Sequence, residues 1–116
     1  MKKNNSALSD LTVLDLSRLL PGPYCSMILA DHGARVIAVE DKRFMADGHF
    51  INMIYRNKEH ISLDLKTQKG KEIFFKLARK ADIVMEGFRP GVTARLGIDY
   101  ETVKGVNPQI IYCSIT

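Results

Sequence analysis

The sequence predicts an α/β fold in which helices cover both faces of an open, mostly parallel sheet. Three observations lead to this prediction. Short apolar runs of the kind found in buried strands alternate with segments of helical periodicity. A strand, a helix and a second strand follow one another within about 30 residues, the usual length of a βαβ unit. The last apolar run ends the sequence with no further element to cover it, so the domain is expected to be incomplete.

The first half of the chain is expected to hold one βαβ unit behind a polar lead-in at residues 1–10. Its strands are residues 12–17 (TVLDLS) and 35–40 (RVIAVE), the second of which is rich in β-branched residues. Between them, residues 20–23 (LPGP) are expected to form a turn, and Pro23 suits the first position of a helix, because the N–H group that proline lacks would have no partner there. This helix should end near Gly33, and because it is apolar on most sides it is expected to be deeply packed.

The second half continues the alternation with shorter elements. Further strands are expected at residues 61–65 (ISLDL), 83–86 (IVME) and 109–115 (QIIYCSI). Further helices are expected at residues 47–55, from 67 to about 80, from 91 to about 96 and from 99 to 107. Thr67 can cap its helix, which carries an apolar stripe on one side and cations mostly on the other, so this helix should lie on the surface of the sheet.

Composition and charge narrow the function classes. The 116 residues, 46% of them hydrophobic and 26% charged, suit one globular domain. No run approaches the roughly 18 apolar residues of a membrane span, so a cytoplasmic location without a membrane partner is expected. The net charge is +4, and residues 42–80 hold ten Lys or Arg against four Asp or Glu, which suits a phosphate-bearing partner or an ordinary solvated face. No nucleic-acid partner is expected, because no recognition motif accompanies the charge.

The common nucleotide, metal and nucleophile motifs are missing. The first strand–helix turn reads LLPGPYC instead of G-x-G-x-x-G, and there is no P-loop, which disfavours an NAD or ATP site. The three histidines have no metal-ligand spacing, so no metal site is expected. Cys25 and Cys113 lie far apart and are predicted to be plain buried thiols. Ser17 and Ser26 have neither a neighbouring base nor a nucleophile elbow.

Two turns at the carboxyl ends of expected strands could bind phosphate, because ligands of open α/β sheets bind at that edge. The first covers residues 63–67, and the second covers residues 86–91 and is followed by Arg95. Each turn combines backbone N–H groups at a helix start with a cation, which together can bind phosphate oxygens, and Phe88 could offer a flat face to an adenine ring. Ordinary turn chemistry explains the same residues equally well, with Thr67 as a cap and Phe88 in the core.

Four blocks of the sequence resemble the class III CoA-transferase family, of the CaiB/BaiF type, which includes formyl-CoA and carnitine CoA-transferases and α-methylacyl-CoA racemase. The blocks are VLDLSRLLPGPYCSMILADHGARVIAVE, ISLDLKTQKGKE, ADIVMEGFRPGVTARLG and NPQIIYCSI, and they occur in the family order with similar spacing. The resemblance implies that residues 11–116 are the Rossmann-like, coenzyme-A-binding N-terminal part of such a protein.

The resemblance also implies which residues line the coenzyme A site. They are Arg18, Leu19 and Leu20 in the first turn, Leu63, Asp64, Leu65 and Lys66 in the LDLK block, Gly87, Phe88 and Arg89 in the third block, and Arg95 near the CoA phosphates. Two departures from the family pattern matter. At Gly87 the family usually has Asn, so one side-chain hydrogen bond is lost. At Asp41 it often has Arg, and a carboxylate there would repel a phosphate unless Lys42 or Arg43 supplies the positive charge.

Three functions remain open. The first is a CoA-transferase, which moves CoA between an acyl-CoA thioester and a carboxylic acid after an aspartate attacks the thioester. The second is an acyl-CoA racemase, which uses acid–base residues at the α-carbon. The third is a non-catalytic CoA-binding or interaction module.

In both enzymes the resemblance places the reacting aspartate beyond the strand on which the sequence ends, so no catalytic residue is assigned to this chain. Coenzyme A or acyl-CoA is expected as a substrate, with no tightly bound cofactor. Full-length members of the family form interlocked homodimers. The isolated chain is therefore expected to be marginally stable, or to associate through its uncovered last strand.

Overall fold

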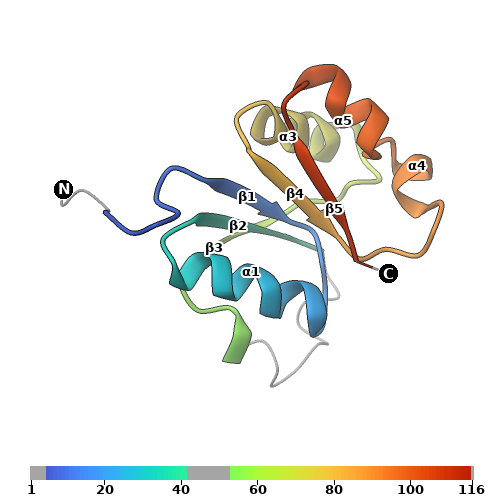
Figure 1. Cartoon of the computed structure of the whole chain (residues 1–116). Helices are drawn as coiled ribbons and strands as arrows, with labels where there is room; N and C mark the ends of the chain where they lie inside the picture. Colours follow the sequence, from blue (N-terminus) through green and yellow to red (C-terminus); the bar gives the residue numbers. More distant parts are fainter. Residues whose placement is uncertain (1–4, 42–52, 116) are drawn as a thin grey trace.

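A single five-stranded sheet organises the chain (Figure 1). The computed structural model describes residues 5–41 and 53–115. The strands are β1 (Thr12–Asp15), β2 (Arg35–Glu40), β3 (Lys58–Ser62), β4 (Ile83–Glu86) and β5 (Ile111–Ser114). They lie in the order β3-β2-β1-β4-β5, and all four pairings are parallel. This is the strand order of doubly wound nucleotide-binding folds, so the prediction of an open, parallel α/β sheet is confirmed.

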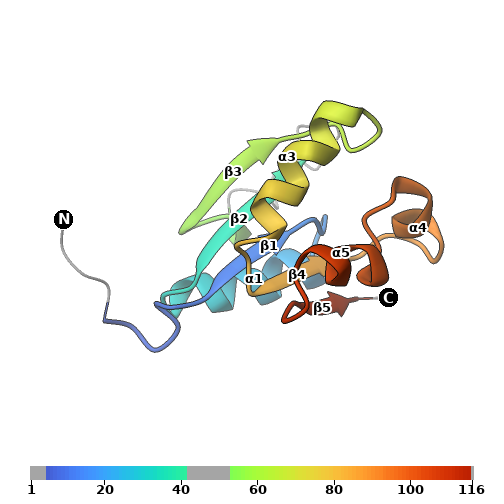
Figure 2. The same cartoon turned by 90° about the horizontal axis from the view of Figure 1, so that it is seen from above.

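The helices lie on opposite faces of this sheet, as the sequence predicts (Figure 2). They are α1 (Pro21–Asp31), α3 (Gln68–Ala78), α4 (Val92–Leu96) and α5 (Tyr100–Val106). In the two views α1 covers one face of the strands, whereas α3 and α5 lie on the other. Each βα connection therefore crosses from one parallel strand to the next over a face of the sheet, as parallel pairing requires. No helix in the described part of the chain is long and apolar enough to cross a membrane.

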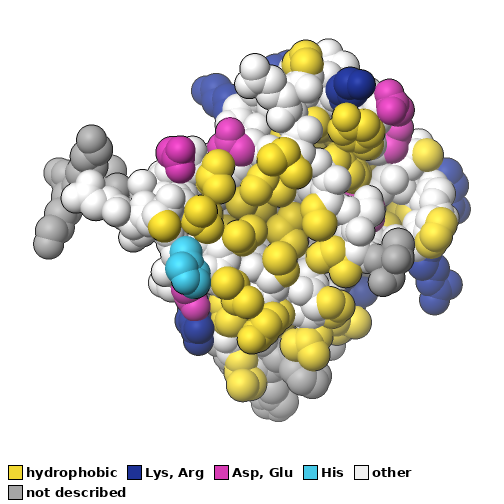
Figure 3. Space-filling view, viewed as in Figure 1, with side chains coloured by type: hydrophobic (Ala, Val, Ile, Leu, Met, Phe, Trp, Pro, Cys, Tyr) yellow, Lys and Arg dark blue, Asp and Glu magenta, His cyan; other side chains and the backbone are white. Residues whose placement is uncertain are grey.

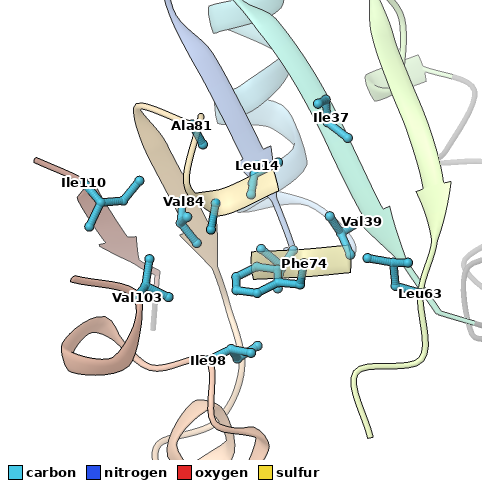
Figure 4. Packing of buried hydrophobic residues seen from close by; sticks show 12 residues of the cluster. Leu14, Ile37, Val39, Leu63, Phe74, Ala81, Val84, Ile98, Val103 and Ile110 are labelled. Carbon is cyan, nitrogen blue, oxygen red and sulfur yellow. The ribbon is translucent and has the colours of Figure 1, made fainter. Parts of the chain in front are cut away.

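The larger of two apolar clusters lies between the sheet and α3 with α5. Phe74 of α3 is fully buried at its centre, among side chains that include Leu14 and Val84 from the strands and Val103 from α5 (Figure 4). The predicted apolar stripe on α3 is the part of that helix that makes this contact. Burying an aromatic side chain of this size stabilises the fold by roughly 2 to 3 kcal/mol.

A smaller cluster lies between the sheet and α1, where Val13, Val36 and Met85 meet Ala30. Successive residues of β1 point to opposite faces of the sheet, so Val13 belongs to this cluster and Leu14 to the other. The expectation that α1 is packed on most sides is wrong: Tyr24 is 52% exposed and Ile28 40%. The reason is that only one side of α1 faces the sheet. Figure 3 shows a broad hydrophobic surface on this face of the molecule.

The third strand differs from its predicted position. The sequence predicts a strand at residues 61–65, whereas β3 covers Lys58–Ser62 and ends where its partner β2 ends, with Ser62 opposite Glu40. The apolar alternation continues past this point because Leu63 is buried and Leu65 half-buried against the larger cluster. Of the helix expected at residues 47–55, Met53 and Ile54 are helical, and residues 47–52 lie outside the described residues.

Candidate functional site

Three turns follow the carboxyl ends of strands at one edge of the sheet. The first turn (residues 16–20) follows β1 and leads into α1, the second turn (residues 63–67) follows β3 and leads into α3, and the third turn (residues 87–91) follows β4 and leads into α4. The arrowheads of β1, β4 and β5 point to the side where α1 begins and α4 lies (Figure 1). In open α/β sheets this edge is where ligands bind. Since β1 and β4 are neighbours, the first and third turns lie side by side.

Each turn is organised by a carboxylate that accepts the backbone N–H of the residue two positions later. Asp15 accepts from Ser17 N at 2.8 Å, Asp64 from Lys66 N at 3.0 Å, and Glu86 from Phe88 N at 2.8 Å. Carboxylates commonly stabilise turns in this way. The expectation that the two predicted phosphate turns offer free backbone N–H groups is therefore wrong at Lys66 and Phe88, because protein carboxylates already hold these two donors.

The first turn has an unusual backbone. Leu19 has φ of 65° in the left-handed region, which costs a non-glycine residue energy and often marks a functional segment. Leu19 is 49% exposed and Leu20 52%, so two large apolar side chains face solvent there. Gly22 passes so close to Ser17 that a β-carbon built on it would lie 2.1 Å from Ser17 Oγ. Only glycine permits this approach, which draws the start of α1 against the end of β1.

The second turn is closed by the predicted cap of α3. Thr67 Oγ1 accepts the backbone N–H of Gly70 at 3.0 Å and donates to Asp64 O at 2.8 Å. A β-carbon on Gly70 would overlap Asp64 O at 2.0 Å, so glycine is required for the helix to start this close to the turn. The capping role of Thr67 is confirmed. The buried Leu63 anchors the turn from below, while Asp64 and Lys66 stay exposed.

The third turn lies beside the first turn and contains an exposed cation. A β-carbon built on Gly87 would lie 3.9 Å from Ser17 Cβ, which shows how close the two turns are. Arg89 is exposed, as is Arg95 on α4. Phe88 is half-buried against the larger cluster, so part of its ring serves the core and part remains accessible. Within residues 5–41 and 53–115, Lys66, Arg89 and Arg95 make no salt bridge.

The structure therefore separates the predicted site residues into two groups. Seven are well exposed: Leu19, Leu20, Asp64, Lys66, Gly87, Arg89 and Arg95. Four are buried or half-buried: Arg18, Leu63, Leu65 and Phe88. The first and third turns are brought together directly, whereas the second lies beyond β2, at the edge strand β3. Asp41 is half-buried at the end of β2, and Lys42 and Arg43 lie outside the described residues.

A buried polar network below the first turn is missing from the sequence prediction. Asp15 is 1% exposed, and both Ser17 Oγ and Ser26 Oγ donate to its carboxylate. The ammonium group of Lys58, fully buried, lies 3.7 Å from Asp15 Oδ2 and donates to the backbone oxygen of Pro23 at 2.9 Å. Burial lowers the pKa of Lys58, and the charge of Asp15 opposes this change. No periodicity in the sequence marks a lysine in the middle of RNKEH as buried.

The cysteines are only partly as predicted. Cys25 is exposed on α1 and Cys113 is half-buried on β5, and neither forms a disulfide. The prediction of two buried thiols is wrong for Cys25, because this residue lies on the outer side of α1. Desolvation raises the pKa of the Cys25 thiol, which makes its reactive thiolate scarcer at neutral pH. Among the described residues, no group of three metal-binding side chains comes together.

The fold and its turns define an α/β protein whose parallel sheet carries a ligand-type edge with exposed cations. The family model of CoA-transferase family III matches residues 8–116, and the chain therefore belongs to this family. The resemblance found in the four sequence blocks is confirmed by this match.

Several named proteins are similar to this chain. Succinyl-CoA:mesaconate CoA-transferase of Haloarcula hispanica is 40% identical over 94% of this chain and 31% of its own length. Human alpha-methylacyl-CoA racemase is 36% identical over 95% of this chain and 28% of its own length. A crystal structure of a CAIB/BAIF family protein from Brucella suis superposes with a TM-score of 0.92 at 35% identity, covering 97% of this chain and 34% of that one. The chain thus spans about a third of the length of the relatives it matches.

Proposed function

We propose that this chain forms part of the coenzyme A site of a CoA-transferase, which moves CoA between an acyl-CoA thioester and a carboxylic acid. The observation that carries the proposal is the junction of the first and third turns at the carboxyl edge, where Gly87 lies next to Ser17 and the cations Arg89 and Arg95 are exposed. Such an edge fits a ligand that has both phosphates and an extended, partly apolar arm. The similarity to named CoA-transferases supports the reaction class.

The exposed residues are assigned direct contacts. Lys66, Arg89 and Arg95 take the phosphate oxygens, because they are exposed cations without a salt bridge in the described part of the chain. Leu19 and Leu20 offer apolar surface to the arm of the coenzyme. Leu63 and Leu65 have an indirect role: their packing in the core holds the second turn at the edge of the sheet.

Two described carboxylates at this edge, Asp15 and Glu86, stabilise turns and are not assigned to the reaction. Asp15 and Glu86 are 1% and 6% exposed, and each accepts a backbone N–H, so neither is available to attack a thioester. An aspartate that forms the covalent intermediate of a transferase must reach the substrate directly. The family resemblance puts this aspartate after β5, and the proposal follows it.

A racemase is the second candidate function, and the human racemase that is 36% identical over 95% of this chain favours it. The two enzymes differ in what the whole protein does to an acyl-CoA in deuterated water. A racemase exchanges the α-proton for deuterium without needing an acceptor acid. A transferase yields a new acyl-CoA only when a carboxylic acid is added. A protein that does neither but binds CoA would be the non-catalytic module.

Three further expectations belong to the proposal. The CoA thioester is a substrate that comes and goes, with no tightly bound cofactor. The full-length protein is a homodimer, and it works in the cytoplasm. Gel filtration of the full-length protein with light scattering tests the second of these, and fractionation of the source cells tests the third.

Calorimetric titration of the purified chain with coenzyme A tests the binding proposal. Arg95→Met and Lys66→Met should each weaken binding about tenfold, since a charge-assisted hydrogen bond contributes roughly 1.5 kcal/mol. Lys80→Met is the matched control, because Lys80 is an exposed lysine at the opposite edge of the sheet. A folded chain that fails to bind at millimolar CoA removes the proposal, and parent-like affinity in Arg95→Met and Lys66→Met removes the phosphate assignment.

A further inference from the structure

Lys58 is buried at the meeting point of four segments. It belongs to β3, and its ammonium group lies 3.7 Å from Asp15 Oδ2 at the end of β1. The same group donates to Pro23 O in the first turn of α1 at 2.9 Å, and it lies 4.4 Å from the centre of the Tyr55 ring. A fully buried lysine is rare and is kept only where several partners compensate its charge. Lys58 has three such partners.

These contacts lie on both sides of the first turn (residues 16–20) along the chain. Asp15, immediately before the turn, accepts the backbone N–H and the hydroxyl of Ser17 and the hydroxyl of Ser26. Pro23, the third residue of α1 after the turn, accepts from Lys58 through its backbone oxygen. The chain between these anchors includes Leu19 in its left-handed conformation. A strained residue persists only where its surroundings hold it in place.

We propose that Lys58 is a positioning residue for the first turn: its contacts with Asp15 and Pro23 hold residues 16–20 in the shape that meets the ligand. Lys58 does not touch the ligand, because its side chain is fully buried. It acts through the two ends of the turn. The inference deepens the coenzyme A proposal and rests on it for the identity of the ligand.

Lys58 belongs to the second βαβ unit (β3, α3 and β4), whereas the turn that it holds belongs to the first (β1, α1 and β2). β3 is the edge strand and pairs only with β2 in the described sheet. Lys58 is opposite Val36 and Asp15 is opposite Ala38, so the contact of Lys58 with β1 and α1 passes over a face of β2. The first turn is consequently correct only when β3 has docked. This makes the binding shape of the first turn a property of the assembled sheet.

Hydrogen exchange followed residue by residue by NMR tests the positioning role. In Lys58→Met, the amides of Ser17 and Tyr24, which donate to Asp15 Oδ1 and Leu20 O, should exchange at least about tenfold faster. The amides of Leu63 and Ile115, which donate to Glu40 O and Glu86 O on other strands, should accelerate less than those of Ser17 and Tyr24, because they feel only the loss of global stability and not the loss of the anchors of the first turn. Binding of coenzyme A should weaken about tenfold. Lys80→Met should change none of these quantities.

A second variant allows the same test if Lys58→Met does not fold. In Asp15→Asn/Lys58→Met, the amide oxygen of the new residue can still accept from Ser17 N, and the Ser26 hydroxyl can donate to Pro23 O, which is already 3.3 Å away. This variant removes both buried charges and leaves no lone one. The proposal expects Tyr24 to exchange faster in it than in the parent, with weaker CoA binding.

The outcomes separate the two proposals. Parent-like exchange at Tyr24 in both variants overturns the positioning role, and so does acceleration of Leu63 and Ile115 to the same degree as Ser17 and Tyr24, because that pattern means general loss of stability. If the parent chain does not bind coenzyme A while the exchange pattern is as expected, the coenzyme A proposal fails and Lys58 still positions the first turn.

Discussion

The two ends of α1 are tied to the same short segment in opposite ways. At the amino end, Lys58 reaches Asp15 and Pro23 in a site without solvent. At the carboxyl end, Arg56 and Asn57 hold Asp31 in the open, where the Arg56 side chain is 57% exposed and the Asp31 side chain 27%. Both ties pair a cation with a carboxylate across more than twenty residues of sequence. They differ mainly in burial, which decides how much each one contributes.

Burial makes the amino-end tie costly to break and the carboxyl-end tie nearly dispensable. A buried charge that loses its partner has no water to solvate it, whereas an exposed one is simply rehydrated. The amino end of α1 also borders the candidate ligand turn, while the carboxyl end is remote from the carboxyl edge of the sheet. The buried tie is thus at the end of α1 that borders the candidate ligand turn.

The largest expected effect is that of Lys58→Met. Removing the ammonium leaves the Asp15 carboxylate buried without a cation, which should lower the free energy of unfolding by about 3 kcal/mol. Urea unfolding measured by circular dichroism gives this value. The double variant Asp15→Asn/Lys58→Met should recover more than half of the loss, because no lone buried charge remains. Additive losses in the double variant would show that Lys58 and Asp15 do not act as a pair.

Gly22→Ala should have the second largest effect. Alanine is the better helix former by about 1 kcal/mol, but its β-carbon would lie 2.1 Å from Ser17 Oγ and push Ser17 away from Asp15. We expect the overlap to win, with a net loss of about 1 to 3 kcal/mol in thermal or urea unfolding. Gly105→Ala is the control, since nothing lies within 4 Å of a β-carbon at that helical position. A stabilised Gly22→Ala would mean that the turn and α1 can move apart freely.

At the carboxyl end of α1 the expected effect is a small dependence on pH. Hydrogen bonds from Arg56 and Asn57 lower the pKa of Asp31 below its usual range. The folded state therefore holds the Asp31 proton less tightly than the unfolded state does. This contribution is fully present above the unfolded pKa of about 4 and disappears as the pH falls through the lowered value. Asp31→Asn should thus differ from the parent in unfolding at pH 6, and the difference should shrink as the pH falls below about 4.

Arg56→Gln should have the smallest effect. Its partner Asp31 remains solvated when the guanidinium is removed, so the unfolding midpoint should shift little. Salt at 0.5 M, roughly, should remove what difference there is, because screening acts on exposed charges. The same salt should not change the decrease in the free energy of unfolding that Lys58→Met causes. A shift in Arg56→Gln as large as that in Lys58→Met would contradict the role of burial in this comparison.

Much of the fold is predictable because it depends on local chemistry. The β-branched residues of β2 and the Thr67 cap of α3 each act within a few residues of their own position. The start of α1 is predicted only approximately: the helix begins at Pro21, two residues before the predicted start at Pro23. The boundaries of β3 are not predictable in this way. Lys58 to Ser62 are a strand because they lie beside Val36 to Glu40, and the alternation of Leu63 and Leu65 continues past the strand because both contact the core from the turn.

The sequence predicts only part of the candidate site. The turns at residues 63–67 and 86–91 stand out because they follow strands and contain cations. Two of their backbone donors are not free, because Asp64 and Glu86 accept from them. A carboxylate two residues before the donor is the sequence signal for this kind of turn. The exposure of Cys25 depends on which side of α1 meets the sheet, which an almost uniformly apolar helix does not encode.

The sequence by itself determined the order of the elements, the two-sided cover of the sheet, the family and the loops that form the carboxyl edge. These follow from short-range preferences and from the parallel connection of strands. Only the tertiary structure decided that the first and third turns meet at Ser17 and Gly87, and that Lys58 is buried against Asp15. The physical reason is that burial depends on which distant segments exclude water together. A lysine forty-three positions from its carboxylate carries no local mark of that partnership.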